Sequence, residues 1–344
     1  MKSEFIRQEH KRRKAEYKND DTVYDFLLSM NKELSRKEIY KPSGKKYPTI
    51  FVFGLPRSGT TLLYQLISYS LDLGYVNNLI ARFWLAPLHG IMLSKAVLGD
   101  ARDGSFVSDY GKSINIAGPH EFSYFWMHWL GIRSIDEMLL FGSNRKDINW
   151  KRLKSVISCM QDIFEKGMVF KNNYVANLLK NFSTNFDMPI FIYIERDVRD
   201  VALSILKARK SYYDNLDAWW GTYPPEYHSL KTLPFHQQIA GQVTGLIRVY
   251  EKQIELIHED SILRVNYDEL CQSPASIIEL IIERVNRLYG FPINFINRPP
   301  SEFQRTGMRR NLCEDEKKVL KSLRKNFYNN FYSYIDKKEG EPDE

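Results

Sequence analysis

Residues 49–70 constrain the fold more than any other part of the chain, and they read TIFVFGLPRSGTTLLYQLISYS. The run of β-branched and aromatic residues from 49 to 53 predicts a strand that is buried on both faces. Apolar residues after Gly59 recur at helical spacing, which predicts a helix that begins there. A strand, a loop bounded by two glycines and a helix together indicate an α/β domain with a phosphate-binding loop.

The loop itself lacks one residue of the common phosphate-binding pattern G-x-x-x-x-G-K-[ST]. Aligning GLPRSGTT on that pattern places Gly54 and Gly59 on the glycines, Thr61 on the hydroxyl residue and Thr60 on the lysine. Arg57 restores a cation inside the loop. Because the lysine reaches the β- and γ-phosphates of a triphosphate, its loss argues against a nucleoside triphosphatase or kinase and favours a ligand with one phosphate at the loop. The alternative is a turn that binds no ligand.

A second candidate anion site follows the strand predicted for PIFIYIE, residues 189–195. Arg196 stands at the C-terminal end of that strand, and Asp197 can cap the helix that follows. Ser204 lies nearly two helical turns after Asp197 and therefore on the same face. We expect Arg196 and Ser204 to meet at the C-terminal edge of the sheet, where α/β proteins bind ligands. An ordinary surface helix with a capping aspartate is the alternative.

The rest of the chain predicts one α/β domain, a P-loop-type parallel sheet flanked by helices, with helical additions. Further strands are expected at 167–171 and 261–267, and a long helix at about 273–289. Helical patterns dominate residues 80–165, with breaks at Gly104, Gly111 and Gly118-Pro119. The predicted units are a helical arm at 1–46, the α/β domain at 47–334 and a disordered tail at 335–344.

Composition narrows the possible partners. The net charge is +7 and the isoelectric point about 9.0, which fits either a nucleic-acid surface or a polyanionic small ligand. The basic residues are spread along the chain without a nucleic-acid-binding motif, so we expect a small ligand and no nucleic acid. Apolar runs are too short for a bilayer and the N-terminus has no apolar signal core, so we expect a cytoplasmic protein without a membrane partner. The oligomeric state is not readable from the sequence.

The two motifs together resemble those of sulfotransferases. P-R-S-G-T-T after the first strand resembles the 5′-phosphosulfate loop of that family, and R-D-x-x-D-V-A-x-S resembles its 3′-phosphate motif. The resemblance runs from about residue 48 to residue 290. It implies transfer of a sulfuryl group from 3′-phosphoadenosine 5′-phosphosulfate (PAPS) to a hydroxyl or amine, with 3′-phosphoadenosine 5′-phosphate (PAP) as the product and no metal required.

By this resemblance, residues of both motifs bind the donor. The 5′-phosphosulfate is assigned to Arg57, Ser58, Gly59, Thr60 and Thr61. The 3′-phosphate is assigned to Arg196 and Ser204, with Tyr267 against the nucleotide and with Arg309 or Arg310 closing the site.

The general base is not fixed by the resemblance. Lys171 in FKNNY matches a lysine that approaches the sulfuryl group in many members, but Asn173 stands where their histidine would be. The glutamate that other members carry after the phosphate loop is also absent, since that region reads YVNNLIARFW. The segment PHEFSYFW looks like one found in a bacterial branch of the family, and it offers His120 or Glu121 as the base. A structural histidine at the start of a buried aromatic helix is the alternative.

Other functions stay open at this stage. The missing base positions suit a non-catalytic PAP-binding protein, and a degenerate P-loop kinase is a further alternative. Aromatic residues near the expected pocket, including Trp219 and Trp220, favour a small-molecule acceptor such as a secondary metabolite or glycoside. Both tryptophans are equally compatible with adenine stacking and with core packing.

Overall fold

A five-stranded parallel sheet forms the centre of the computed structural model, which describes residues 13–15, 20–139, 147–307 and 311–338. The strand order is β2-β3-β1-β4-β5, and every pairing is parallel. The predicted parallel α/β fold is therefore confirmed, and β2 is the one strand that the sequence did not predict. The strands are β1 (Thr49–Gly54), β2 (Gly74–Tyr75), β3 (Met168–Lys171), β4 (Pro189–Glu195) and β5 (Ile262–Asn266).

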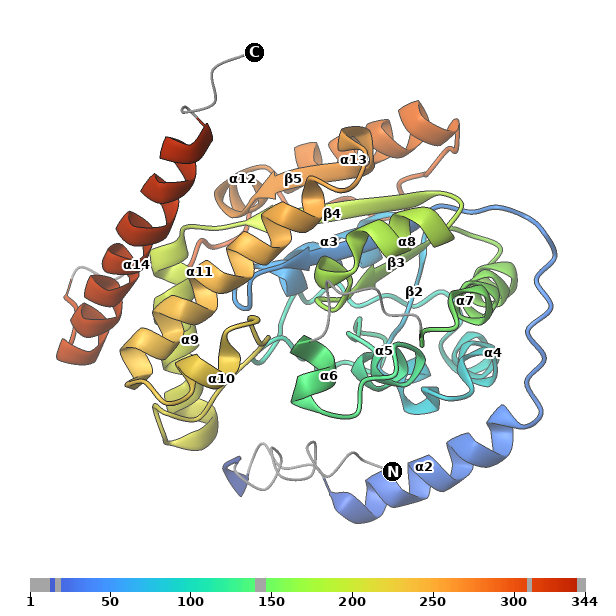
Figure 1. Cartoon of the computed structure of the whole chain (residues 1–344). Helices are drawn as coiled ribbons and strands as arrows, with labels where there is room; N and C mark the ends of the chain where they lie inside the picture. The colour runs from blue at the N-terminus through green and yellow to red at the C-terminus, as the bar shows by residue number, and fades with distance from the viewer. Residues whose placement is uncertain (1–12, 16–19, 140–146, 308–310, 339–344) are drawn as a thin grey trace.

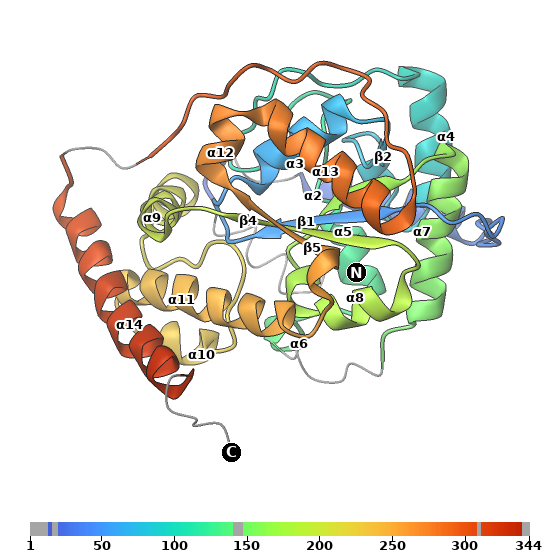
Figure 2. The ribbon, with the colours of Figure 1, turned by 90° about the horizontal axis from the view of Figure 1, so that it is seen from above.

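Helices cover both faces of this sheet (Figure 1, Figure 2). On one face lie α3 (Thr60–Ser70), α12 (Tyr267–Gln272) and α13 (Pro274–Tyr289). The opposite face is covered by α8 (Leu179–Asn185), α9 (Val198–Tyr213) and α11 (Phe235–Ile254). The remaining helices are α2 (Asp21–Ser35), α4 (Pro87–Leu98), α5 (Ser123–Trp129), α6 (Ile135–Leu139), α7 (Trp150–Phe164), α10 (Tyr227–Leu230) and α14 (Glu314–Lys338), with 3-10 turns η2 (Ile80–Phe83), η3 (Val175–Asn177) and η4 (Glu259–Ser261).

The central strands are apolar on both sides because each side faces its own core. Side chains alternate along a strand. Phe51 and Phe53 of β1 accordingly belong to the core under α5, α7, α8 and α11, whereas Ile50 and Val52 belong to the core under α3 and α13. All four are fully buried. This double burial explains why the sequence shows continuous apolar runs instead of alternation.

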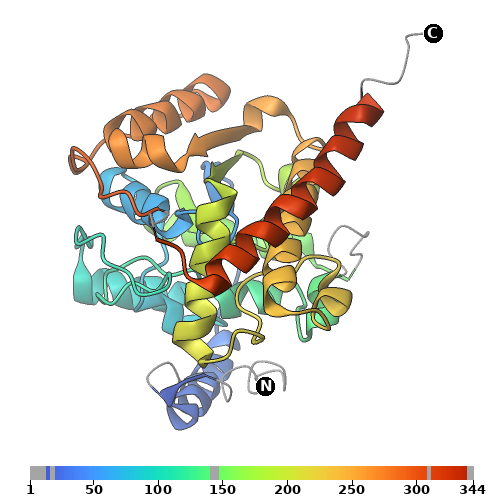
Figure 3. The same ribbon diagram turned by 90° about the vertical axis from the view of Figure 1, so that its left-hand side faces the viewer.

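The two ends of the chain pack onto this domain through helices. α2 docks beside η2, where Tyr24 stacks on Trp84 and the Asn31 amide donates a hydrogen bond to the Arg82 carbonyl at 2.7 Å. α14 crosses α9 and α11 (Figure 3), and Val319 and Leu323 are buried there. α14 continues through Lys338, into the segment predicted as a tail, and residues 339–344 lie outside the described part.

Residues 99–122, between α4 and α5, contain no helix. Helical patterns predicted for 80–165 therefore fail over this stretch, although the predicted breaks at Gly104, Gly111 and Gly118-Pro119 all fall inside it. α4 ends at Gly99, whose φ of 56° and ψ of −126° form a backbone conformation that favours glycine and cannot continue a helix. The loop then returns toward β1, so that chain far from the strands in sequence reaches their C-terminal ends.

Membrane-spanning segments were sought among the described helices, and none has the length and apolar character to cross a bilayer.

Candidate active site

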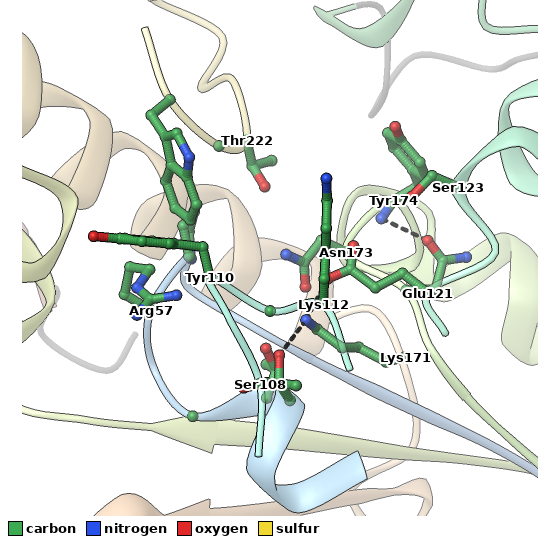
Figure 4. A pocket seen from close by; sticks show the side chains of 18 of the residues that line it. Arg57, Ser108, Tyr110, Lys112, Glu121, Ser123, Lys171, Asn173, Tyr174 and Thr222 are labelled. Carbon is green, nitrogen blue, oxygen red and sulfur yellow. Dashed lines mark hydrogen bonds and ion pairs between the residues drawn. The ribbon is translucent and has the colours of Figure 1, made fainter. Parts of the chain in front are cut away.

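A cavity of about 590 Å³ opens at the C-terminal edge of the sheet (Figure 4). Residues that follow four of the five strands line it: Gly59 after β1, Lys171 at the end of β3, Arg196 after β4 and Tyr267 after β5. Parallel strands end at one edge, so the topology alone gathers these side chains, as the sequence predicted. The loop 99–122 contributes the facing wall.

The phosphate loop ends in a helix whose N-terminus is open to the cavity. Gly59 caps α3 with a φ of 104°, no side chain caps the first turn, and that turn holds no acidic residue. The first backbone N–H groups of a helix have no intrahelical acceptor, and the helix dipole favours negative charge there. Thr60 and Thr61 begin the helix and line the cavity. The loop is therefore built to hold an anion.

Gly59 cannot be replaced without disturbing this loop. A Cβ atom on Gly59 would lie 2.5 Å from Cδ2 of Tyr267, and the positive φ adds strain for any other residue. We expect Gly59→Ala to lower the free energy of unfolding by more than about 1 kcal/mol and to weaken binding of PAP. Urea denaturation and calorimetric titration measure the two effects.

Gly44→Ala is the matched control for this variant. Its φ of 88° is similar, but among the described residues no atom lies within 4 Å of a Cβ built there. Gly44→Ala should therefore lower the free energy of unfolding only through backbone strain, and it should bind PAP normally. Equal behaviour of the two variants in both measurements would contradict the close packing of Tyr267 under the loop.

Arg57 joins the two predicted anion sites. Its Nε donates a hydrogen bond to Ser204 Oγ at 3.0 Å, and its carbonyl accepts one from Arg196 Nη1 at 3.0 Å. The Arg57 guanidinium lies between the rings of Tyr110 and Trp220, at 5.2 and 5.6 Å from their centroids. Burial lowers the pKa of Arg57 from its usual value. Arg57 thus joins Arg196 and Ser204, and no direct hydrogen bond between those two is found in the described residues. Arg57 and Arg196 line the cavity, whereas Ser204 lies behind Arg57 and does not.

Arg196 lies flat on Tyr267, with Cζ 4.1 Å from the ring centroid. Its Nη2 donates to the backbone carbonyl and to the hydroxyl of Thr306, which is also 3.1 Å from the Tyr267 hydroxyl. Nε of Arg196 has no hydrogen-bond partner within the described ranges, which leaves a donor for a ligand. Thr306 shows that the segment after α13 reaches the site; Arg309 and Arg310 lie outside the described residues.

Ser58, also predicted to bind the donor, is fully buried beneath the loop. Its hydroxyl has no hydrogen-bond partner in the described part of the chain. Ser58 does not line the cavity, whereas Thr60 and Thr61 do.

Lys171 links the phosphate loop to the proposed base. Its Nζ donates to Thr61 Oγ1 at 2.7 Å and forms an ion pair with Glu121, and only 6% of its side chain is exposed. Burial alone would raise the pKa of Glu121, but the charge and hydrogen bond of Lys171 outweigh it and hold that pKa below its usual value. Glu121 is thus an ionised carboxylate beside the loop, and solvent still reaches 43% of its side chain from the cavity.

His120 is oriented differently from its neighbour. Its Nδ1 accepts a hydrogen bond from the backbone N–H of Phe122 at 2.9 Å, so the neutral ring carries its proton on Nε2. Burial lowers the pKa of His120 to about 4. The one basic nitrogen of the neutral ring, Nδ1, already accepts a hydrogen bond, so the ring can only donate one to a ligand through Nε2. The geometry therefore favours Glu121 over His120 as the base.

The low pKa of His120 predicts a pH-dependent stability. Between its ordinary value of 6.5 and its folded value of about 4, the unfolded chain binds more protons, so the free energy of unfolding should fall as pH falls through this window. His120→Asn keeps an acceptor for the Phe122 N–H but does not titrate. Urea unfolding at neutral pH and at about pH 5 should therefore show a smaller pH difference in the variant. An unchanged difference would contradict the buried, neutral ring.

The asparagines at the two vacant base positions have separate roles. Asn77 is buried and donates to Ser94 Oγ at 2.7 Å, while Asn78 donates to the Ser113 and Asn115 carbonyls at 3.1 and 2.8 Å. The Asn78 side chain therefore holds the loop 99–122, whereas the Asn77 side chain ties η2 to α4. Asn173 does line the cavity, but an amide cannot act as a base.

Two cavity residues that sequence reasoning missed lie in the loop 99–122. Tyr110 packs on Arg57, and Lys112 extends into the cavity in Figure 4. The sequence signal was weak, since DYGK shows only a turn glycine between polar residues. Of the two tryptophans, Trp220 contacts Arg57, whereas Trp219 is buried and stacks on Tyr223.

Comparison with known proteins was made at three levels. No protein-family model matches the chain, and a search of curated proteins finds no match. The solved structures that this fold resembles include sulfotransferases. They include sulfotransferase STF9 from Mycobacterium avium (11% identity, TM-score 0.48, covering 90% of this chain and 72% of that one) and STF1 from Mycobacterium tuberculosis H37Rv (12%, 0.45, 87% and 75%).

A third such structure is the sulfotransferase domain from the curacin biosynthetic pathway, with 14% identity and a TM-score of 0.41, covering 70% of this chain and 75% of that one. At identities and TM-scores this low, the likeness assigns neither an activity nor a residue role to the present chain. The functional proposal therefore has to come from the site.

Proposed function

We propose that the protein is a sulfotransferase that uses PAPS to sulfate a hydroxyl or amine of a small-molecule acceptor. One observation carries the proposal: Arg57, which lines the cavity next to an uncapped helix N-terminus, hydrogen-bonds to both Ser204 and Arg196, so the two predicted anion sites are adjacent. A triphosphate needs its anionic groups in one chain, held by a loop lysine. PAPS has two separate anionic groups, the 5′-phosphosulfate and the 3′-phosphate, and two separate anion sites suit such a ligand. The loop lysine is dispensable because there is no triphosphate chain for it to hold.

The residues present fit this donor. The open N–H groups of α3, with Thr60, Thr61 and Lys171, would hold the 5′-phosphosulfate. Arg196, whose Nε is without a partner in the described structure, would bind the 3′-phosphate together with Ser204. No group of three or more His, Cys, Asp or Glu side chains that could hold a metal ion lies among the described residues.

Transfer needs a base, a charge-stabilising group and alignment. PAPS supplies an activated sulfuryl group: its bond to the 5′-phosphate oxygen breaks, that oxygen keeps the electron pair, and a bond to the acceptor oxygen or nitrogen forms. Glu121 would accept the acceptor proton. Lys171, in contact with both Thr61 and Glu121, would stabilise charge on the transferring group and on the leaving phosphate.

Turnover tests this proposal. The protein is incubated with PAPS and a panel of phenols, alcohols and amines, and PAP release is followed beside sulfated product by mass spectrometry. The Glu121→Gln protein is the matched control, since it keeps the loop and Lys171. Stoichiometric PAP and sulfated product, above the level of this control, are expected.

A second candidate is a non-catalytic PAP-binding protein, which is favoured by Asn173 at the histidine position and by the lack of an acidic residue in YVNNLIARFW, where other members carry a glutamate. PAP binding without PAP release from PAPS in the presence of any acceptor would support it. A P-loop kinase is disfavoured by Thr60 at the lysine position, and phosphate transfer from ATP with Mg²⁺ would be its test.

A further inference from the structure

A tight hairpin turn at residues 109–112 forms the wall of the cavity opposite the phosphate loop. The Asp109 N–H donates to the Lys112 carbonyl at 2.9 Å, and the Lys112 N–H donates back to the Asp109 carbonyl at 3.0 Å. Between them, Tyr110 and Gly111 have φ of 46° and 91°. Two central residues with positive φ are typical of a type I′ turn, which usually has Asn-Gly there. Tyr110 adopts this conformation at a cost, which indicates a constrained position.

The tip of this turn touches the residues proposed for transfer. A Cβ atom on Gly111 would lie 3.4 Å from Thr61 Oγ1, 3.5 Å from Glu121 Oε1 and 3.6 Å from Lys171 Nζ. The backbone of Gly111 therefore borders the point where donor, base and acceptor would meet. The residue that follows Gly111 also lines the cavity.

Lys112 is the residue so placed. In Figure 4 its side chain rises between Tyr110 and Tyr174, with the ammonium end directed away from Lys171. No hydrogen bond or ion pair of its side chain is found with the described residues. Burial lowers the pKa of Lys112 and the positive charge of Arg13 lowers it further, which the carboxylates of Asp109 and Glu121 only partly offset. The closeness of Arg13 to the Lys112 ammonium group is unfavourable unless an anion binds between the two cations.

The charges of the residues that line the cavity also indicate an anionic ligand. Glu121 is the one carboxylate among the described lining residues, against five cations: Arg13, Arg57, Lys112, Lys171 and Arg196. Arg57, Lys171 and Arg196 are those assigned to the donor, and Lys171 already neutralises Glu121. Arg13 and Lys112 are the two lining cations that are not assigned to the donor. Arg13 lies near the ring of Tyr212, with its buried Nε unpartnered in the described structure.

We propose that the acceptor carries an anionic group, which Lys112 binds with the help of Arg13, beside the hydroxyl or amine that is sulfated. This inference rests on the proposed function, because it defines the acceptor of that same site. The body of the acceptor is expected to be aromatic or apolar, because apolar and aromatic side chains line the same cavity: Tyr124, Met127, Met138, Trp219 and Tyr223.

Matched pairs of ligands test the inference. The first arm titrates PAP into the protein by calorimetry, which tests the donor site alone. The second arm titrates PAP-loaded protein with para-hydroxybenzoate, para-hydroxyphenylacetate and para-hydroxyphenylpropionate, each beside its methyl ester. At least one acid is expected to bind about tenfold or more tightly than its ester, as one charge-assisted hydrogen bond provides.

Variants at residue 112 assign the preference. Lys112→Met should remove the difference between acid and ester, and Lys112→Arg should retain it. Both should bind PAP within about twofold of the wild type, a difference too small for a lost charge-assisted contact. Lys180→Met, at an exposed lysine of α8 outside the cavity, is the control and should change neither titration.

Three outcomes would overturn the inference. Esters that bind as well as the acids, or a panel in which no acid binds the PAP-loaded protein, would show that no anionic group is selected. A Lys112→Met variant that loses PAP affinity as strongly as acid affinity would place Lys112 in the donor site. Failure of PAP to bind in the first arm would instead contradict the proposed function, and the acid and ester pairs are then compared on the protein without PAP.

Discussion

Glu121→Gln is expected to lower the turnover of PAPS by roughly 10²–10⁴-fold, the usual contribution of a positioned general base. The carboxylate lies in the cavity, forms an ion pair with Lys171 and stays ionised because that lysine holds its pKa below the usual value. Gln can keep a hydrogen bond to Lys171 but cannot accept a proton. PAP should still bind, so the loss should appear in kcat. Steady-state kinetics with PAP release as the readout measures it.

His120→Asn is the matched variant for this prediction. Because Nδ1 of His120 is used by the Phe122 N–H, its replacement by another acceptor should reduce kcat much less than Glu121→Gln does. If His120→Asn instead abolished turnover while Glu121→Gln kept near-wild-type rates, the assignment of the base would be reversed. Equal, small effects in both variants would mean that neither residue accepts the proton.

Arg196→Met is expected to weaken PAP binding by about 10–100-fold, as the loss of charge-assisted hydrogen bonds to a phosphate implies. The side chain is held over Tyr267 and against Thr306, so its guanidinium is fixed before any ligand arrives. Adenosine 5′-phosphosulfate, which lacks the 3′-phosphate, should bind the variant and the wild type alike. Calorimetric titration of both nucleotides gives the comparison.

Arg199→Met controls for the loss of an arginine on the same helix. Arg199 is exposed, pairs with Asp197 and does not line the cavity. Its replacement should leave the affinity for both nucleotides unchanged. If Arg196→Met weakened the two nucleotides equally, Arg196 would support the loop through the Arg57 carbonyl and would not read the 3′-phosphate.

The sequence predicted the parts of the fold that local patterns encode. Strands β1, β3 and β4 appear as apolar runs because a parallel sheet covered on both faces buries nearly all of their residues. β5 lies at the edge of the sheet, and its exposed Arg264 and Asn266 interrupt the apolar pattern. The anion sites could be placed because each follows a strand directly, and parallel strands end at one edge. β2 was missed because its two residues, Gly74–Tyr75, are too short to show a pattern.

The acceptor side of the cavity could not be predicted in the same way. Its wall, residues 99–122, has no periodicity and is held by contacts with distant chain, such as the hydrogen bonds from Asn78 to Ser113 and Asn115. The roles of His120 and Glu121 also looked equivalent in sequence. They separate only through one backbone hydrogen bond from Phe122 and one ion pair with Lys171.

Thermal unfolding with nucleotides tests the central claim most directly. A ligand that binds only the native state raises the unfolding midpoint. We expect PAP to raise the midpoint clearly and adenosine 5′-phosphosulfate to raise it less. In Arg196→Met the two nucleotides should raise the midpoint equally. A higher midpoint with ATP and Mg²⁺ but not with PAP would contradict a donor site with separate 5′-phosphosulfate and 3′-phosphate sites and would favour a kinase.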